Sequence, residues 1–112
     1  MQFLLLLHDD EQAWIDMSEA EQHAVIGEHM AYSEALTKAG AFVEGAPLDP
    51  STTARIVTAD NVQDGPYADS KEQLGGYYRI ETSSMDEAID WAKRCPVAKT
   101  GKVEVRPVPD YG

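Results

Sequence analysis

The stretch that decides the fold runs from residue 64 to residue 96 and begins Asp64-Gly65-Pro66-Tyr67, followed by Lys71-Glu72-Gln73-Leu74-Gly75-Gly76-Tyr77-Tyr78. Asp64 can accept hydrogen bonds from the amides just ahead of it, Gly65 tolerates positive φ, and Pro66 fixes φ. This pattern predicts a rigid chain reversal. The pair Gly75-Gly76 opens a predicted strand over residues 77–82. It indicates a bulge or the close approach of another backbone or a ligand, unless it only kinks the strand entrance.

The remainder of this stretch predicts a helix. Ser84 and Glu87 have the spacing of a capping box, in which a hydroxyl and a carboxylate satisfy free amides at the helix start. The helix stops at Pro96, and a last strand covers residues 102–108. Prolines at the end of that strand indicate that it stops soon afterwards or lies at a sheet edge.

Upstream, the sequence predicts a strand followed by a long helix. Residues 3–8 form a strand that is apolar on both faces, and residues 9–17 are predicted to be an acidic connector. A capping box at Ser18 and Glu21 starts a helix that runs to about residue 39, with Gly40 as its terminator. Helical spacing gives this helix an inward stripe of Val25, His29, Tyr32 and Leu36.

The order of elements points to one fold. Short strands are predicted at residues 41–45 and 53–59, which gives strand, helix, strand, extra strand, strand, helix, strand. Without the extra strand this is the split β-α-β pattern of ferredoxin-like α+β folds, an antiparallel sheet with two helices on one face. Two helices leave the other face of the leucine-rich strand uncovered. We therefore expect a homodimer packed sheet to sheet, a dimeric α+β barrel.

Composition limits the classes of function. The chain of 112 residues is expected to be a single domain over residues 1–112, and 43% hydrophobic residues are typical of a globular protein. A net charge of −11 argues against nucleic acid and against anionic membranes as partners. The single cysteine excludes an internal disulfide framework and fits a reducing compartment. The apolar start is too short to span a bilayer, so a cytoplasmic location is expected.

Three of the four arginines fall in predicted strands. Alternation places Arg79 and Glu81 on one face of their strand, while Tyr78 lies on the other. The arginines either form cross-strand ion pairs or line a cleft that binds a carboxylate or a phosphate. The candidate ligand-binding residues are Arg79, Arg106, Arg55, His8 and Tyr78.

His29 is the candidate catalytic residue, because its helical position points inward. An inward histidine is either a hydrogen-bonded core residue or a general acid and base. His8 with Asp9 and His29 could in principle bind a metal, but no diagnostic ligand spacing is present, and no metal or cofactor is expected. Cys95 ends a helix, where the dipole disfavours the thiolate, so it is not expected to be a nucleophile.

Several motifs together resemble the YCII-related domain family, in its DGPF-type branch. The motifs are Asp64-Gly65-Pro66-Tyr67, Lys71 to Tyr78, Asp86-Glu87-Ala88, Trp91-Ala92 and Val103 to Pro107. The resemblance covers essentially the whole chain. In the motif that gives the branch its name, Tyr67 stands at the position of the Phe. The resemblance implies a ferredoxin-like fold and a dimer. It also implies a histidine at position 29 paired with an aspartate just before Pro96, where this sequence has Cys95.

Two functions remain open from sequence. In the first, the protein is a homodimeric module that binds a small anionic ligand in a cleft lined by His29 and the strand arginines. In the second, it is an enzyme acting on a small metabolite, with His29 as general acid and base and Arg79 or Arg106 orienting an anionic group.

Overall fold

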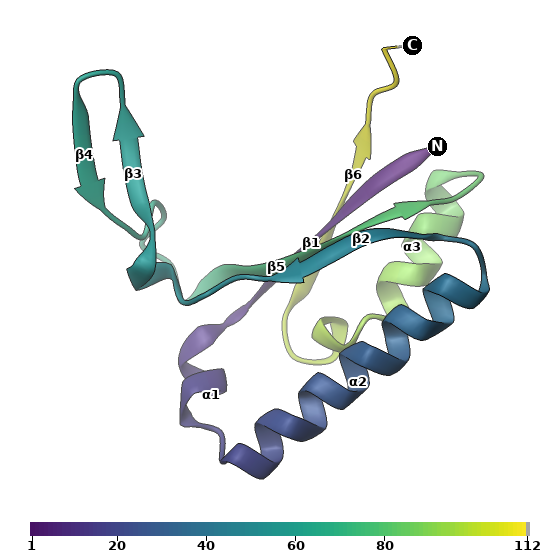
Figure 1. Cartoon of the computed structure of the whole chain (residues 1–112), viewed down its shortest axis with the longest axis horizontal. Helices are drawn as coiled ribbons and strands as arrows, with labels where there is room; N and C mark the ends of the chain where they lie inside the picture. The colour runs from purple at the N-terminus through teal and green to yellow at the C-terminus, as the bar shows by residue number, and fades with distance from the viewer. Residues whose placement is uncertain (112) are drawn as a thin grey trace.

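The computed structural model describes residues 1–111, drawn in Figure 1. The elements in chain order are β1 (Gln2–Asp10), α1 (Glu11–Asp16), α2 (Glu19–Lys38), β2 (Phe42–Pro47), the short 3-10 helix η1 (Ser51–Thr53), β3 (Arg55–Thr58), β4 (Asn61–Asp64), β5 (Glu72–Glu81), α3 (Met85–Arg94), the 3-10 helix η2 (Pro96–Lys99) and β6 (Lys102–Val108).

The main sheet confirms the ferredoxin-like prediction. Its strand order is β2-β5-β1-β6, and every neighbouring pair is antiparallel. Helices α2 and α3 lie on one side of this sheet (Figure 1). The extra segment between β2 and β5 forms a separate hairpin, β3–β4, which stands on the other side (Figure 1). We call the sheet face away from α2 and α3 the open face.

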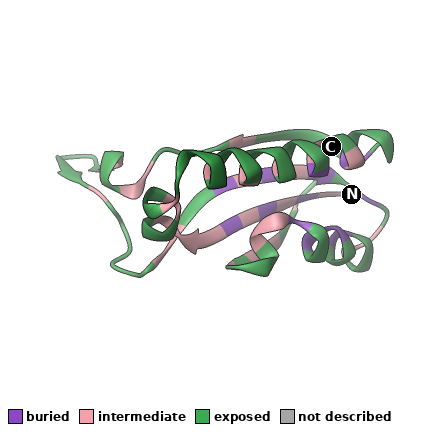
Figure 2. Cartoon of the chain, turned by 90° about the horizontal axis from the view of Figure 1, so that it is seen from below, coloured by how far each residue is buried: buried purple, intermediate pink, exposed green. Residues whose placement is uncertain are grey.

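Alternation along β1 divides its leucines between the two faces. Phe3 and Leu5 are fully buried on the helix side, while Leu4 and Leu6 are half-buried on the open face. Figure 2 shows the buried segments gathered where the helices meet the strands. The core between sheet and helices contains Phe3, Leu5, Leu7, Tyr32, Leu36, Tyr78, Ile80, Trp91 and Cys95.

The first predicted capping box is present in full and the second only in part. At α2 the Ser18 hydroxyl accepts from the Glu21 amide at 3.1 Å, and the Glu21 carboxylate accepts from the Ser18 amide at 3.0 Å. At α3 the Ser84 hydroxyl accepts from the Glu87 amide at 3.1 Å. The Glu87 carboxylate accepts instead from the amide and the hydroxyl of Ser83, one residue earlier.

The structure differs most from the prediction in three segments. The segment 9–17 is not an irregular connector, because the Asp10 carboxylate caps α1 by accepting from the amides of Gln12 and Ala13. The extra strand is half of a hairpin, since β3 pairs with β4. Strand β5 begins at Glu72 rather than Tyr77, because the residues before the glycines already pair with the end of β1.

The glycine pair therefore lies inside β5 and forms a bulge, which is one of the alternatives that the sequence left open, instead of only a kink at the strand entrance. Leu7 pairs with Gly76 and His8 with Leu74, so Gly75 is the extra residue between them. Gly76 also meets a close backbone, because a Cβ there would come within 3.0 Å of the Ala46 carbonyl oxygen.

Candidate functional site

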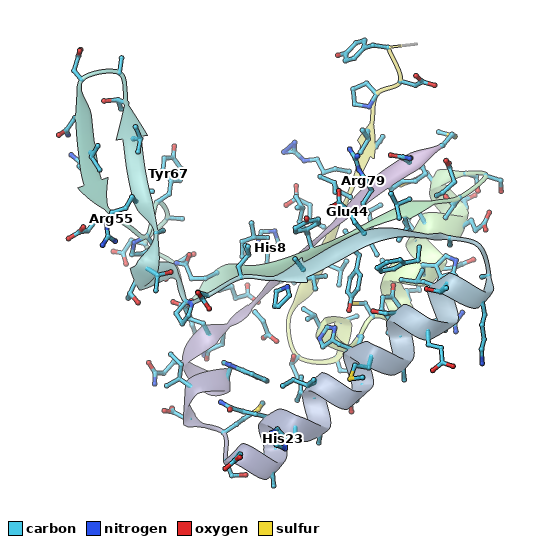
Figure 3. The ribbon with its side chains drawn as sticks, in the orientation of Figure 1. His8, His23, Glu44, Arg55, Tyr67 and Arg79 are labelled. Atoms are coloured by element: carbon cyan, nitrogen blue, oxygen red, sulfur yellow. The ribbon has the colours of Figure 1, made fainter. Side chains whose placement is uncertain are left out.

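The predicted site residues do not converge on one cleft. His29 and Tyr78 meet between α2 and the sheet, whereas Arg79 lies on the open face. Tyr78 and Arg79 are consecutive in β5, so their side chains must point to opposite faces. Figure 3 shows Arg79, Glu44 and His8 on the side of the sheet opposite α2. A single cleft lined by His29 and the strand arginines is thus not formed within one chain, which corrects that expectation.

Arg79 borders a small pocket on the open face, which we call the Arg79 pocket. Its volume is about 330 Å³, and it is lined by Leu4, Leu6, Glu44, Leu74, Tyr77 and Arg79. The Nε atom of Arg79 is buried and has no hydrogen-bond partner among the described residues. Glu44 is the register partner of Arg79, but its carboxylate accepts from the Tyr77 hydroxyl at 3.2 Å. The adjacent Glu44 charge raises the pKa of Tyr77.

Glu104 joins two other predicted site residues. One of its carboxylate oxygens lies 3.0 Å from Nε of Arg106, and the other lies 3.0 Å from Nε2 of His8. The hydrogen bond from Arg106, followed by the one from His8, holds the pKa of Glu104 below its usual value. For Arg106 the structure therefore favours the alternative of ion pairing on a strand face.

A larger cavity of about 860 Å³ lies at the end of the sheet where β1 meets β6 and β5, and we call it the His8 cavity. Two lysines border it: Lys102 is 2.7 Å from Glu72, and Lys71 is 3.6 Å from Asp10. The full lining is His8, Asp9, Asp10, Ala13, Ser70, Lys71, Glu72, Thr100, Lys102, Val103 and Glu104. His8 was predicted as a ligand-binding residue and Asp9 was considered beside it as a metal ligand. The other lining residues were not predicted as site residues, because only the fold brings the segments around 8–13, 70–72 and 100–104 together.

His29 has an interior hydrogen-bond partner. Its Nδ1 atom lies 2.7 Å from the Tyr78 hydroxyl, and the two rings stack at 6.0 Å with an angle of 17°. Burial lowers the pKa of His29, and the neighbouring Glu28 charge partly opposes this. Burial also raises the pKa of Tyr78. Tyr78 thus fixes the orientation of the His29 ring, a task that the resemblance assigns to an aspartate.

Cys95, at the position of that aspartate, is a core residue. It is 1% exposed, and burial raises the pKa of its thiol to about 11. A thiol that is protonated and enclosed in this way is unsuited to nucleophilic attack. Next to it in the core, the Tyr32 hydroxyl donates to the Trp91 carbonyl oxygen at 2.7 Å.

The remaining predicted residue, Arg55, lies on the β3–β4 hairpin (Figure 3). Its Nε is 3.4 Å from Asp64 across the hairpin, and its side chain also donates to the carbonyl oxygens of Thr53 and Ala54. Arg55 is therefore occupied within its own segment, on a hairpin that stands on the side of the sheet opposite α2. Within residues 1–111, no three His, Cys, Asp or Glu side chains are grouped so that they could hold a metal ion. In the same residues, each helix is too short or too polar to span a bilayer.

Comparison with known proteins gives relatives over nearly the whole chain. An uncharacterized protein of Rhizobium meliloti (strain 1021) is 35% identical over 117 residues, which cover 99% of this chain and 94% of the relative. A solved structure of 5-chloro-2-hydroxyhydroquinone dehydrochlorinase from Burkholderia phenoliruptrix AC1100, in complex with 2,5-dihydroxybenzoquinone, is similar in fold. Its TM-score is 0.54 at 22% identity, with 97% of this chain and 94% of that chain covered. The sequence model of the YCII-related domain matches residues 1–111, and the chain belongs to this family.

Proposed function

We propose that this protein is a homodimeric module that binds a small anionic molecule on its open face, with Arg79 as the anchoring residue. The observation that carries the proposal is the buried Nε–H group of Arg79, which has no partner in the described chain and borders a pocket. A buried donor without a partner costs about 1–3 kcal/mol. A ligand oxygen that accepts from this group would offset that cost.

The other arginines of the predicted site do not have this property. Arg106 is paired with Glu104, and Arg55 is paired with Asp64. Arg79 faces Glu44, whose carboxylate already accepts from Tyr77. A guanidinium presents a planar fork of donors that fits the two oxygens of a carboxylate or phosphate. The leucines of the same pocket suit the apolar part of such a ligand.

A second copy of the chain is the proposed cover for the open face. Leu4, Leu6 and Leu74 form an apolar stripe there, while Glu104 and Arg106 lie beside it on the neighbouring strand β6. A face that carries both signs of charge beside an apolar stripe can be self-complementary across a two-fold axis. Two sheets packed in this way form the expected α+β barrel and would close the Arg79 pocket from above.

The structural neighbour supports the size class of the ligand. That dehydrochlorinase is in complex with 2,5-dihydroxybenzoquinone, a single ring with polar substituents. A molecule of similar size fits the proposed pocket volume of about 330 Å³. At 22% identity the likeness supports the fold's capacity to hold such a molecule and assigns no reaction to this chain.

Binding of simple anions tests the proposal. Benzoate and inorganic phosphate are titrated into the protein, and amide chemical shifts are followed by NMR. We expect saturable shifts of residues lining the Arg79 pocket, and at least tenfold weaker binding in Arg79→Gln. Arg55→Gln is the matched control, because Arg55 is also a strand arginine but lies on the hairpin. Equal affinity in Arg79→Gln, or no binding of either probe, would contradict the proposal.

An enzyme that uses His29 is the second candidate. The favouring observation is the 2.7 Å contact between His29 Nδ1 and the Tyr78 hydroxyl, which holds the ring in one orientation. Because burial lowers the pKa of His29, the imidazole is neutral near neutral pH and can accept a proton. This candidate requires that Nε2 of His29 reach a substrate, which the titration described in the Discussion examines.

A further inference from the structure

The His8 cavity contains a histidine and carboxylate pair that the proposed function does not use. His8 Nε2 lies 3.0 Å from one oxygen of Glu104, and Arg106 holds the other oxygen at 3.0 Å. Both His8 and Glu104 line the cavity of about 860 Å³. At the wall of this cavity the imidazole of His8 is thus bonded to the carboxylate of Glu104, which is in turn bonded to the guanidinium of Arg106.

Two glycines give this corner of the sheet its shape. Gly75 is the bulge residue of β5 directly where the register shifts between Leu7 and His8. Bulges change the direction of neighbouring side chains and are frequent beside active sites. At Gly101 a Cβ would come within 2.1 Å of the His8 carbonyl oxygen, so only glycine allows this approach of the chain before β6.

The Glu104 bond determines which nitrogen of His8 carries the proton. The pKa of Glu104 is held low, so its carboxylate is ionised at neutral pH and can only accept hydrogen bonds. Nε2 of neutral His8 must therefore be the N–H nitrogen, and Nδ1 carries the lone pair. Within residues 1–111, no hydrogen bond to this Nδ1 is found. Arg106 keeps Glu104 in place through its second oxygen.

The cavity wall also carries two cationic side chains, Lys71 and Lys102, which can bind an anionic substrate. The Lys102 ammonium lies 2.7 Å from Glu72 and the Lys71 ammonium 3.6 Å from Asp10, and both side chains are largely exposed. Each ammonium has three N–H groups, so donors remain beyond those directed at the carboxylates. The Ser70 hydroxyl lies on the same wall, where it donates to the Glu72 carbonyl oxygen at 2.6 Å.

We propose that His8 is the acid and base residue of a second site, which transfers protons on small carbonyl compounds that carry an anionic group. Nδ1 of His8 takes a proton from the carbon next to the carbonyl group. The electron pair of the broken C–H bond forms a carbon–carbon double bond, and the π pair of the carbonyl group moves to its oxygen, which gives an enolate near the lysines. The imidazolium, stabilised by Glu104, then returns a proton to the same carbon, and the carbonyl group is restored.

This step balances without an oxidant, a reductant or a second substrate. Its outcome is exchange of the hydrogen on the carbon next to the carbonyl group with hydrogen from solvent. Glu104 acts as a positioning residue because it holds Nε2 of His8, and Arg106 acts through Glu104, whose second oxygen it holds. The class of ligand is a small 2-oxo acid or a related carbonyl compound, bound by the lysines through its carboxylate.

Deuterium exchange into pyruvate tests the proposal. The protein is incubated with pyruvate in D₂O, and loss of the methyl proton signal is followed by ¹H NMR. We expect exchange above that of buffer with the wild type, a fall to the buffer rate in His8→Gln, and a reduction of about tenfold in Glu104→Ala, which is smaller than the roughly 100-fold or larger effect of an acid and base group itself. His23→Gln is the control, because His23 is an exposed histidine on α2 outside this cavity.

A second readout separates positioning from loss of folding. Long-range ¹H–¹⁵N spectra report which imidazole nitrogen carries the proton, without any ligand. We expect Nε2–H for His8 in the wild type and a mixture of tautomers in Glu104→Ala. Wild-type exchange at the buffer rate, or equal rates in wild type and His8→Gln, would overturn the proposal. So would Nδ1–H as the main wild-type tautomer of His8.

Discussion

At the scale of single residues, one peptide step separates two environments of this protein. Tyr78 contacts His29 in the covered layer, and the next residue, Arg79, lines a pocket on the open face. The alternation of Tyr78 and Arg79 is visible in the sequence, so their separation could be predicted. That His29 belongs with Tyr78 could not, because it depends on how α2 lies across the sheet. A single cleft lined by His29, Tyr78 and Arg79 is therefore inconsistent with the alternation of side chains along β5.

The burial of His29 leads to a prediction about how the stability of the protein depends on pH. Burial sets the folded-state pKa of His29 below its ordinary value of 6.5, so the unfolded chain takes up a proton first as the pH falls. The contribution of neutral His29 to the free energy of unfolding is therefore complete above about pH 6.5, and it is lost as the pH falls from there through the folded-state pKa. We expect the free energy of unfolding, measured with urea between pH 7.5 and 5, to fall less in His29→Gln than in the wild type.

Direct titration of the His29 ring by NMR accompanies this measurement. We expect a pKa below that of the same residue in the urea-unfolded chain. Parallel pH curves of stability for wild type and His29→Gln would show that burial does not act on this residue. A ring that shifts when benzoate is added would show that a ligand reaches it, which favours the second candidate function.

Two glycines give opposite predictions for the same substitution. At Gly101 an added Cβ would meet the His8 carbonyl oxygen at 2.1 Å, so the backbone must move. At Gly27, in the exposed interior of α2, a Cβ meets nothing within 4 Å. We expect Gly101→Ala to lower the free energy of unfolding by about 1–3 kcal/mol, and Gly27→Ala to raise it by about 0.5–1 kcal/mol. Urea denaturation measures both, and equal stabilities would contradict the close approach at Gly101.

At the scale of elements, local signals predicted the helices better than the connections. The Ser18 capping box was visible in the sequence because its two bonds are local. The start of α1 was missed because the acidic run around Asp10 has no helical spacing of apolar residues. Strand β4 was missed because its residues are all exposed, so no apolar alternation marks it. The cavity residues Lys71 and Lys102 have no local signal and meet only through the sheet.

The cap of α2 gives a prediction at this scale. Ser18→Ala removes the acceptor for the Glu21 amide and leaves an orphan donor at the helix start. We expect the free energy of unfolding to fall by about 0.5–2 kcal/mol. Ser18→Asp keeps an acceptor at the cap and should stay close to the wild type in thermal or urea denaturation. An Ala variant as stable as the Asp variant would mean that the cap contributes nothing to folding.

At the scale of the whole molecule, the sheet is covered on one side only. Helices α2 and α3 bury the side with Phe3 and Leu5, while Leu4 and Leu6 remain half-buried on the open face. The sequence predicted this asymmetry, because β1 is apolar on both faces and only two long helices are available. The β3–β4 hairpin stands on the side of the sheet opposite α2 and α3 (Figure 1). The proposed second copy follows from that uncovered stripe.

A charge placed in the stripe tests the dimer. Leu6 lies at the centre of the open face, opposite Tyr77 on one neighbouring strand and Glu104 on the other. In Leu6→Glu, two-fold packing would bring added carboxylates together in an apolar contact, where unpaired charge is costly. Sedimentation velocity should therefore give twice the chain mass of 12.3 kDa for the wild type and the single mass for Leu6→Glu. Met30→Glu is the control, since Met30 is 68% exposed on the outer side of α2 and should leave the dimer intact. A wild type with the mass of one chain, or a Leu6→Glu variant with the mass of two, would contradict the proposal that a second copy covers the open face.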